Sequence, residues 1–138
     1  MALTANEGRV YEPFPVPVYT DIPLAAGAVV FEGSALGEDT STGYVRALVS
    51  GDTFAGFAAA GANNAAGAAG DAVVRARQAG MVKLDVATAS VAALAATVNF
   101  TDDDTATLGA GSAVGKVSRH VSGTLCMVSF EASALRSL

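Results

Sequence analysis

The side chains that could carry out chemistry in this sequence are few, and their spacing does not form a reaction centre. His120 is the only histidine and Cys126 the only cysteine among 138 residues. His120 lies in a polar run just before Gly123, which is typical of a solvated turn residue and not of a general base. Cys126 lies in the apolar run 125–128, which is typical of a buried, inert thiol. We therefore expect no zinc site and no cysteine–histidine pair.

The densest acidic run is 102–104, three consecutive aspartates between Phe100 and Thr105. A calcium-binding EF-hand loop needs spaced oxygen ligands, a glycine at its sixth position and a distant glutamate, and this pattern is absent. We interpret the run as a hairpin turn. The glycine-rich segment 61–70 has no following Gly-Lys-Ser or Gly-Lys-Thr, so a phosphate site is not expected either. The sequence thus predicts no catalytic residue, no metal and no cofactor.

The overall charge narrows the choice of partners. The net charge is −5, the isoelectric point is about 4.6, and the eight Lys and Arg residues are spread along the chain. Nucleic-acid binding requires clustered cations, so no DNA or RNA partner is expected. Residues 1–7 lack the basic and apolar regions of a secretory signal. The most apolar window, 54–70, is interrupted by Asn63 and Asn64, which predicts a loop and no contact with a membrane.

The length of the chain predicts one domain, and its residue types favour strands. Valine, threonine and aromatic residues occur in short runs between glycines and do not recur at helical spacing. The central stretch of the chain runs from Phe54 to Leu84. A polar link is expected at 33–43 and a tight turn at 78–80. The predicted strands of this first half are 28–32, 44–48, 54–58, 72–77 and 80–84.

The second half repeats this organisation in shorter form. Three segments of the second half match segments of the first: 95–100 matches 26–31, 113–117 matches 54–58, and 124–130 matches 72–77. Between the halves, Asp85 predicts the cap of a short helix over 86–94. The sequence therefore predicts a mainly β fold, a small pseudo-symmetric β-barrel or β-sandwich with one short helix.

The N-terminal segment has a different composition from the rest. All four prolines of the chain lie in residues 1–23, at Pro13, Pro15, Pro17 and Pro23. Alternate prolines remove backbone donors and hold the preceding residues extended, which excludes a helix or a central strand. We predict an extended arm over 1–23 and a single β-rich domain over 24–138. Apolar side chains between prolines lose little entropy on docking, so the arm suits a grip on a neighbouring subunit or a partner.

Several segments follow one another in an order that is similar to a known family. They are 54–58 (Phe-Ala-Gly-Phe-Ala), Asn63 and Asn64 in an alanine and glycine loop, 69–71 (Ala-Gly-Asp), Arg75 and Arg77 on an alternating strand, 80–84 (Gly-Met-Val-Lys-Leu), 98–102 (Val-Asn-Phe-Thr-Asp) and 114–117 (Val-Gly-Lys-Val). In this order the chain resembles the head decoration proteins of tailed phages, also called capsid cement proteins. The resemblance covers roughly residues 22–131.

The resemblance implies a non-enzymatic structural protein of the phage virion. Such proteins assemble as trimers on the outer surface of the expanded head, where they fasten neighbouring major capsid subunits together, and their N-terminal arms commonly add to the capsid lattice. The chain would be made in the host cytoplasm and act on the virion surface. Contacts with the capsid or a neighbouring subunit are expected from Tyr11, Phe14, Val16, Val18, Tyr19, Arg75 and Arg77.

Two alternatives stay open from the residues alone. One is another phage virion module of the tail or fibre. The second is a small acidic ligand-binding or enzyme domain that uses His120 and the aspartates. Arg75 and Arg77 share one face of their strand because side chains alternate, and this spacing favours a solvated face or a subunit salt bridge over an anion site.

Overall fold

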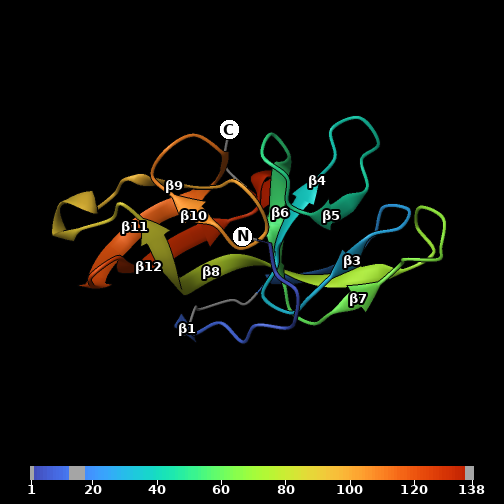
Figure 1. Cartoon of the computed structure of the whole chain (residues 1–138), viewed down its shortest axis with the longest axis horizontal. Coiled ribbons are helices and arrows are strands. Elements are labelled where there is room, and N and C mark those ends of the chain that lie inside the picture. Colours follow the sequence, from blue (N-terminus) through green and yellow to red (C-terminus); the bar gives the residue numbers. More distant parts are fainter. Residues whose placement is uncertain (1, 13–17, 136–138) are drawn as a thin grey trace.

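The prediction of a mainly β fold is confirmed by a computed structural model, shown in Figure 1, which describes residues 2–12 and 18–135. Strands make up 50% of the structure. Within the described residues the only helical segments are two 3₁₀ turns, η1 (Val91–Ala93) and η2 (Ser133–Leu135). The alternation of apolar and polar residues that indicated strands therefore predicts the fold class correctly.

The longest strand, β8 (Val73–Ala87), is the element that the others pair with. Buried residues alternate with more exposed ones over 73–76 and again over 82–87, as expected for a strand with one face on the core. The strands that pair directly with it are β1 (Tyr11–Glu12), β2 (Val18–Pro23), β6 (Thr53–Ala58), β10 (Ala106–Thr107) and β12 (Leu125–Glu131). Because β8 is 15 residues long, different partners occupy different stretches of it.

The second half of β8 belongs to a closed five-stranded barrel, seen in the left half of Figure 1. The barrel order is β8, β12, β11 (Ser112–Ser122), β9 (Thr97–Phe100), β10 and back to β8. All of these pairs are antiparallel except β10 with β8, which is parallel and closes the barrel. Four phenylalanines pack edge to face in the main core, with Phe57 at 4.9 Å from Phe130 between ring centres.

The first half of β8 continues the same sheet beyond the barrel, on the right of Figure 1, in a part that we call the extension. There β6 pairs with β4 (Ala35–Glu38), which pairs with β5 (Val45–Ala47). A separate two-stranded sheet joins β3 (Val29–Val30) to β7 (Ala62–Asn63). A second apolar cluster around Leu24, Leu36 and Val74 lies beneath these strands. The molecule is elongated, with a larger core that the barrel shares with β6 and a smaller one within the extension.

The predicted turn at 78–80 is wrong, because β8 runs through it without a break. Ala79 pairs with Val18 of β2 and with Glu131 of β12, so partners hold the backbone extended at this point. The register with β2 skips Gln78, which marks a β-bulge, and Gly80 has a φ of 152°. Glycine here indicates a bulge within a strand and not the end of a strand.

The short helix expected over 86–94 is reduced to the single 3₁₀ turn of η1. Residues up to Ala87 remain in β8, so Asp85 does not cap a helix. Ser90 takes that role, since its side chain accepts a hydrogen bond from the Ala92 N–H. The polar link expected at 33–43 also contains a strand, β4, which is held between β5 and β6.

Candidate interaction surface

The described part of the N-terminal arm lies on its own chain and is fixed there by Arg9. The Arg9 side chain is only 7% exposed. Its Nε donates to the Gly33 carbonyl at 2.6 Å, and its terminal nitrogens lie 3.1 Å from an Asp104 carboxylate oxygen and 3.2 Å from a Glu7 oxygen. The guanidinium also lies 5.4 Å from the centre of the Phe57 ring. Arg9 therefore connects the arm to both the core and the acidic turn.

The three aspartates of residues 102–104 form a turn between β9 and β10, as predicted, and they also hold the arm. Buried Asp103 accepts hydrogen bonds from the Leu3 N–H at 3.0 Å and from the Ser34 hydroxyl at 2.9 Å. Asp102 accepts from the N–H groups of Asp104 and Thr105 in its own turn. Burial alone would raise the pKa of Asp102, but these hydrogen bonds outweigh it and the pKa is lowered.

The arm then follows one edge of β8 in two strands. Tyr11 pairs with Val82 in β1, and β2 pairs antiparallel with residues 73–79. On the outer face of this pair Tyr19 lies opposite Arg77, and Asp21 lies opposite Arg75. A direct cross-strand position brings side chains within contact distance, so the arm and the sheet build one surface together.

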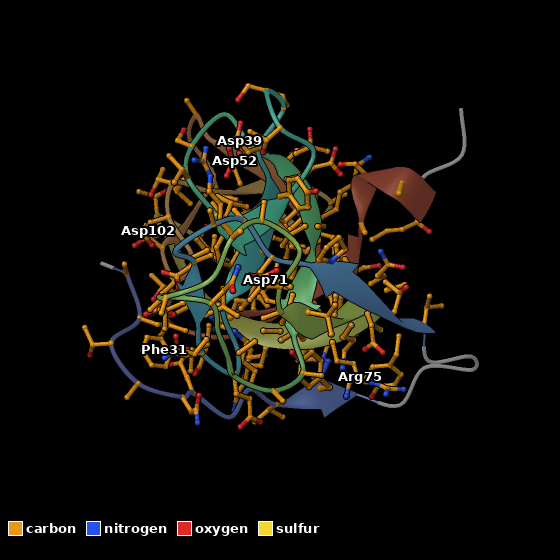
Figure 2. The ribbon with its side chains drawn as sticks, turned by 90° about the vertical axis from the view of Figure 1, so that its right-hand side faces the viewer. Phe31, Asp39, Asp52, Asp71, Arg75 and Asp102 are labelled. Carbon is orange, nitrogen blue, oxygen red and sulfur yellow. The ribbon has the colours of Figure 1, made fainter. Side chains whose placement is uncertain are left out.

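Four of the predicted contact residues meet on this surface, which we call the tyrosine–arginine patch: Tyr11, Tyr19, Arg75 and Arg77. The guanidinium carbon of Arg77 lies 3.9 Å from the centre of the Tyr11 ring and 5.0 Å from that of Tyr19. Arg75 lies 5.4 Å from the Tyr19 ring centre. These are cation–π distances. Figure 2 shows Arg75 beside the blue strands of the arm, away from Asp39 and Asp52.

Stacking on the tyrosine rings restricts the two arginine side chains and leaves their charged groups near the surface. Arg75 and Tyr19 are exposed, whereas Arg77 and Tyr11 are half-buried. Burial raises the pKa of Tyr11, although the nearby Arg77 charge opposes the shift. The planar guanidinium donates in a fixed fork that matches a carboxylate, and the tyrosine rings add apolar area. The patch is thus suited to an acidic protein surface.

Of the three remaining predicted contact residues, the structure describes one. Val18 begins β2 and is half-buried beside the patch. Phe14 and Val16 lie outside the described residues, together with Pro13, Pro15 and Pro17. The patch therefore brings together the residues on either side of this proline-rich segment.

The other residues considered for chemistry have structural positions. Cys126 is fully buried, as predicted, and burial raises the pKa of its thiol, with the Asp85 charge adding to the effect. His120 lies within β11 and not in the turn itself; its Nε2 is 2.9 Å from the carbonyl oxygen of Gly123. Among residues 2–12 and 18–135 no group of three or more His, Cys, Asp or Glu side chains could hold a metal ion.

Sequence reasoning missed an ion cluster on the extension. Arg46 binds Asp52 through two hydrogen bonds of 3.0 and 2.8 Å and lies 3.3 Å from an Asp39 oxygen. The Ser41 hydroxyl and N–H donate to Asp39 and, together with Arg46, lower its pKa. Figure 2 shows Asp39 and Asp52 side by side. Asp39 follows β4, Arg46 lies in β5 and Asp52 precedes β6, so the pairing of β4 with both β5 and β6 brings the three residues together.

The fold and this surface define a small β-barrel protein whose N-terminal arm completes the edge of its longest strand. Comparisons with models of protein families, with curated proteins and with solved structures found no match for the chain. None of the helices in the described ranges has the length and apolar character needed to span a membrane. The geometry and the sequence resemblance are therefore the grounds on which a function is proposed.

Proposed function

We propose that the chain is a bacteriophage capsid decoration protein, which binds the outer surface of the expanded head as trimers and stabilises the lattice of the major capsid protein. Two independent observations support this. The order of segments across roughly residues 22–131 resembles capsid cement proteins, and the fold is a small barrel with a paired arm. The protein is proposed to act without a cofactor and without catalysis.

The observation that carries the proposal is the tyrosine–arginine patch. It is built jointly by the arm and β8, so the arm contributes to a surface without leaving its own domain. Tyrosine and arginine, with tryptophan, are the residue types enriched where protein interfaces gain their affinity. An acidic protein that displays its stacked arginines on one face would turn that face toward acidic groups of the capsid.

Decoration also explains why no single contact has to be strong. A ligand that binds only the assembled state stabilises it by mass action, and the effect is repeated over many sites on one head. The net charge of −5 suits an outer surface that does not capture DNA. The patch would orient each copy of the protein on the capsid, and the many bound copies together would stabilise the head.

The test is co-sedimentation of the protein with undecorated expanded heads and with unexpanded precursors, followed by the heat resistance of the heads. We expect selective binding to expanded heads and added heat resistance. The double variant Arg75→Glu and Arg77→Glu should lose binding, while the control Lys83→Glu, which alters charge on the same strand outside the patch, should keep it. Arg77→Lys retains the charge but loses the planar fork and the ring stacking, so it should bind more weakly than the wild type.

Each outcome decides a different part of the proposal. If the wild-type protein binds neither form of the head, the decoration function is wrong. If it binds expanded heads and the double variant binds equally well, decoration stands but the patch is not the grip. Circular dichroism spectra of the variants would show that a loss of binding does not reflect unfolding.

A further inference from the structure

The extension ends, at the right of Figure 1, in loops that enclose a cavity of about 360 Å³, which we call the extension cavity. Small residues at 25–28 and Ala69 line part of it. The rest of the lining comes from larger side chains between the end of β4 and the middle of β5. They are Asp39, Thr42, Tyr44 and Arg46. A recess of this size, with an apolar lining and a few polar groups, is typical of a small-molecule site.

Hydrogen bonds on both sides hold the wall of the cavity in place. The side-chain amide of Asn64 donates to the carbonyls of Ala25 and Ala68 at 2.9 and 3.0 Å. In the hairpin between β4 and β5, the Asp39 N–H donates to the Tyr44 carbonyl at 3.0 Å. The cavity is therefore preformed, and a ligand would lose little affinity to ordering of the loops.

Tyr44 supplies an aromatic ring to this wall. The residue is half-buried. A Cβ added at Gly70 would lie 3.5 Å from the ring, so the edge of the ring rests against the backbone of the loop that precedes β8. Around it, residues 25–28 and Ala69 contribute methyl groups and backbone. A fixed aromatic ring in a shallow apolar recess suits a ligand that presents a flat face of C–H groups.

The charged groups of the lining form a neutral pair. A guanidinium nitrogen of Arg46 lies 3.3 Å from a carboxylate oxygen of Asp39, so the two opposite charges cancel. Ser41 donates twice to Asp39, and Arg46 also binds Asp52, which fixes both side chains. A guanidinium has five N–H donors and a carboxylate has about four acceptor sites, so both groups retain capacity for further hydrogen bonds.

From this combination we infer that the extension cavity binds a neutral sugar ring of a glycan. A hexose has a face of C–H groups, which would stack on Tyr44, and its hydroxyl groups both donate and accept hydrogen bonds. The pair of Asp39 and Arg46 matches these hydroxyl groups, because one member accepts and the other donates. A charged ligand would meet one group of its own sign at this pair. The volume is sufficient for a single sugar ring.

Sugar binding goes beyond the proposed function and does not depend on it. Figure 2 shows Asp39 well apart from Arg75 of the tyrosine–arginine patch. A copy that is bound to a partner through the patch would therefore keep the extension cavity accessible to a second ligand.

The test is a titration of the full chain with glucose, galactose and mannose, followed by its backbone amide signals in two-dimensional NMR spectra. At least one of these hexoses should shift the signals of residues 25–28, 42–46 and 69, with a dissociation constant on the order of 1 mM. Sorbitol carries its hydroxyl groups on an open chain and should bind at least about tenfold more weakly, because it has no ring to stack. Glucuronate keeps the ring and adds a negative charge, and it should bind no more tightly than glucose.

Variants of the wall locate the binding site. Tyr44→Ala removes the ring and should weaken hexose binding at least about tenfold, whereas Tyr44→Phe keeps the ring and should retain most of the affinity. Ala26→Leu fills the cavity and leaves Tyr44 unchanged, so it tests the site even where Tyr44→Ala fails to fold. Val91→Ala, at a 74% exposed valine of the barrel, is the control and should bind like the wild type.

The absence of amide shifts with all of the hexoses would overturn the inference. Equal binding of sorbitol would also overturn it, since the ring would not be recognised, and tighter binding of glucuronate would indicate an anion site at Arg46 instead. Shifts that persist in both Tyr44→Ala and Ala26→Leu would place the ligand outside the cavity. Because phage heads are not used, these results are separate from success or failure of the decoration proposal.

Discussion

The guanidinium carbon of Arg77 lies 3.9 Å from the centre of the Tyr11 ring, although these residues are not paired in the sheet. Tyr11 pairs with Val82, and Arg77 pairs with Tyr19. The side chain of Arg77 thus contacts tyrosines from both strands of the arm. Tyr11 in turn packs against Phe130 of the core at 6.2 Å between ring centres. The outer patch and the inner core are therefore in contact through one tyrosine.

Removing the Arg77 side chain should loosen the arm without unfolding the domain. We expect Arg77→Ala to lower the free energy of unfolding by about 0.5–2 kcal/mol, the range of cation–π contacts. Urea denaturation would measure the loss, and amide hydrogen exchange should become faster in β1 and β2 while the barrel stays protected.

The matched variant is Tyr11→Phe, which keeps the ring and loses only the hydroxyl. Its unfolding midpoint should lie closer to that of the wild type than the midpoint of Arg77→Ala, because Phe also presents a ring face to the guanidinium. Equal losses in both variants would show that the hydroxyl, and not the ring stacking, stabilises this contact.

Arg9 should matter more for stability than any exposed cation. Arg9→Met keeps the aliphatic stem over Phe57 but leaves the Gly33 carbonyl and the Asp104 carboxylate without their donor. Hydrogen bonds to charged groups contribute about 1.5–3 kcal/mol, so a loss of this order is expected in urea denaturation at neutral pH. The amide of Glu7, which binds the Glu32 carbonyl, should exchange faster.

Lys116→Met provides the comparison for Arg9, because Lys116 is an exposed cation on the barrel. Its unfolding free energy should change by no more than about 0.5 kcal/mol. A similar effect of both substitutions would mean that the buried contacts of Arg9 do not hold the arm.

Local sequence patterns predict the strands that carry their own signal. The alternation at 72–77 falls within β8, where every second side chain of 73–76 is buried, and the apolar run 124–130 corresponds to β12, where the consecutive residues 126–128 are all buried. β4 was missed because Ala35, Leu36 and Gly37 have little intrinsic preference for strands; two flanking strands impose that conformation. The predicted turn at 78–80 is wrong for a different reason, since a glycine at a bulge and a glycine in a turn look alike in sequence.

The sequence predicts which residues contribute to the candidate site, but it does not predict how they are arranged in space. Prolines around Phe14 indicated an extended arm, and alternation placed Arg75 and Arg77 on one face. Nothing local indicates that the arm lies on β8 of its own chain, because that depends on pairing between residues distant in sequence. The buried position of Arg9 follows from the same long-range contacts.

Acid should destabilise the fold partly through Asp39. Hydrogen bonds from Ser41, with the Arg46 charge, lower the Asp39 pKa from its ordinary value of 3.8. A carboxyl with a lowered pKa in the folded state adds stability above its unfolded pKa, and this stability is lost as the pH falls through the folded value. The loss is therefore expected below about pH 4.

Asp39→Asn isolates this contribution. The variant should have a lower urea midpoint than the wild type at pH 7, and the difference should shrink as the pH falls below 3.8, because Asp39 is protonated first in the unfolded chain and then in the fold. Asp71→Asn is the control, because the Asp71 carboxylate accepts from the Ala68 N–H, whereas Arg46 binds Asp39 and Asp52. A constant difference between wild type and Asp39→Asn across this pH range would show that the charge of Asp39 is not involved.

Gly56 should tolerate no side chain, because two independent constraints act on it. Its φ is 130°, and an added Cβ would lie 2.6 Å from the Arg77 carbonyl oxygen in the neighbouring strand β8. Gly56→Ala should therefore cost at least about 1–3 kcal/mol from backbone strain alone, measured by thermal or urea unfolding. Gly8→Ala is the control, since nothing lies within 4 Å of its added Cβ, and its unfolding free energy should change by less than about 0.5 kcal/mol. An unchanged melting profile in Gly56→Ala would contradict the close approach of β6 to β8, the contact on which the position of the extension beside the barrel depends.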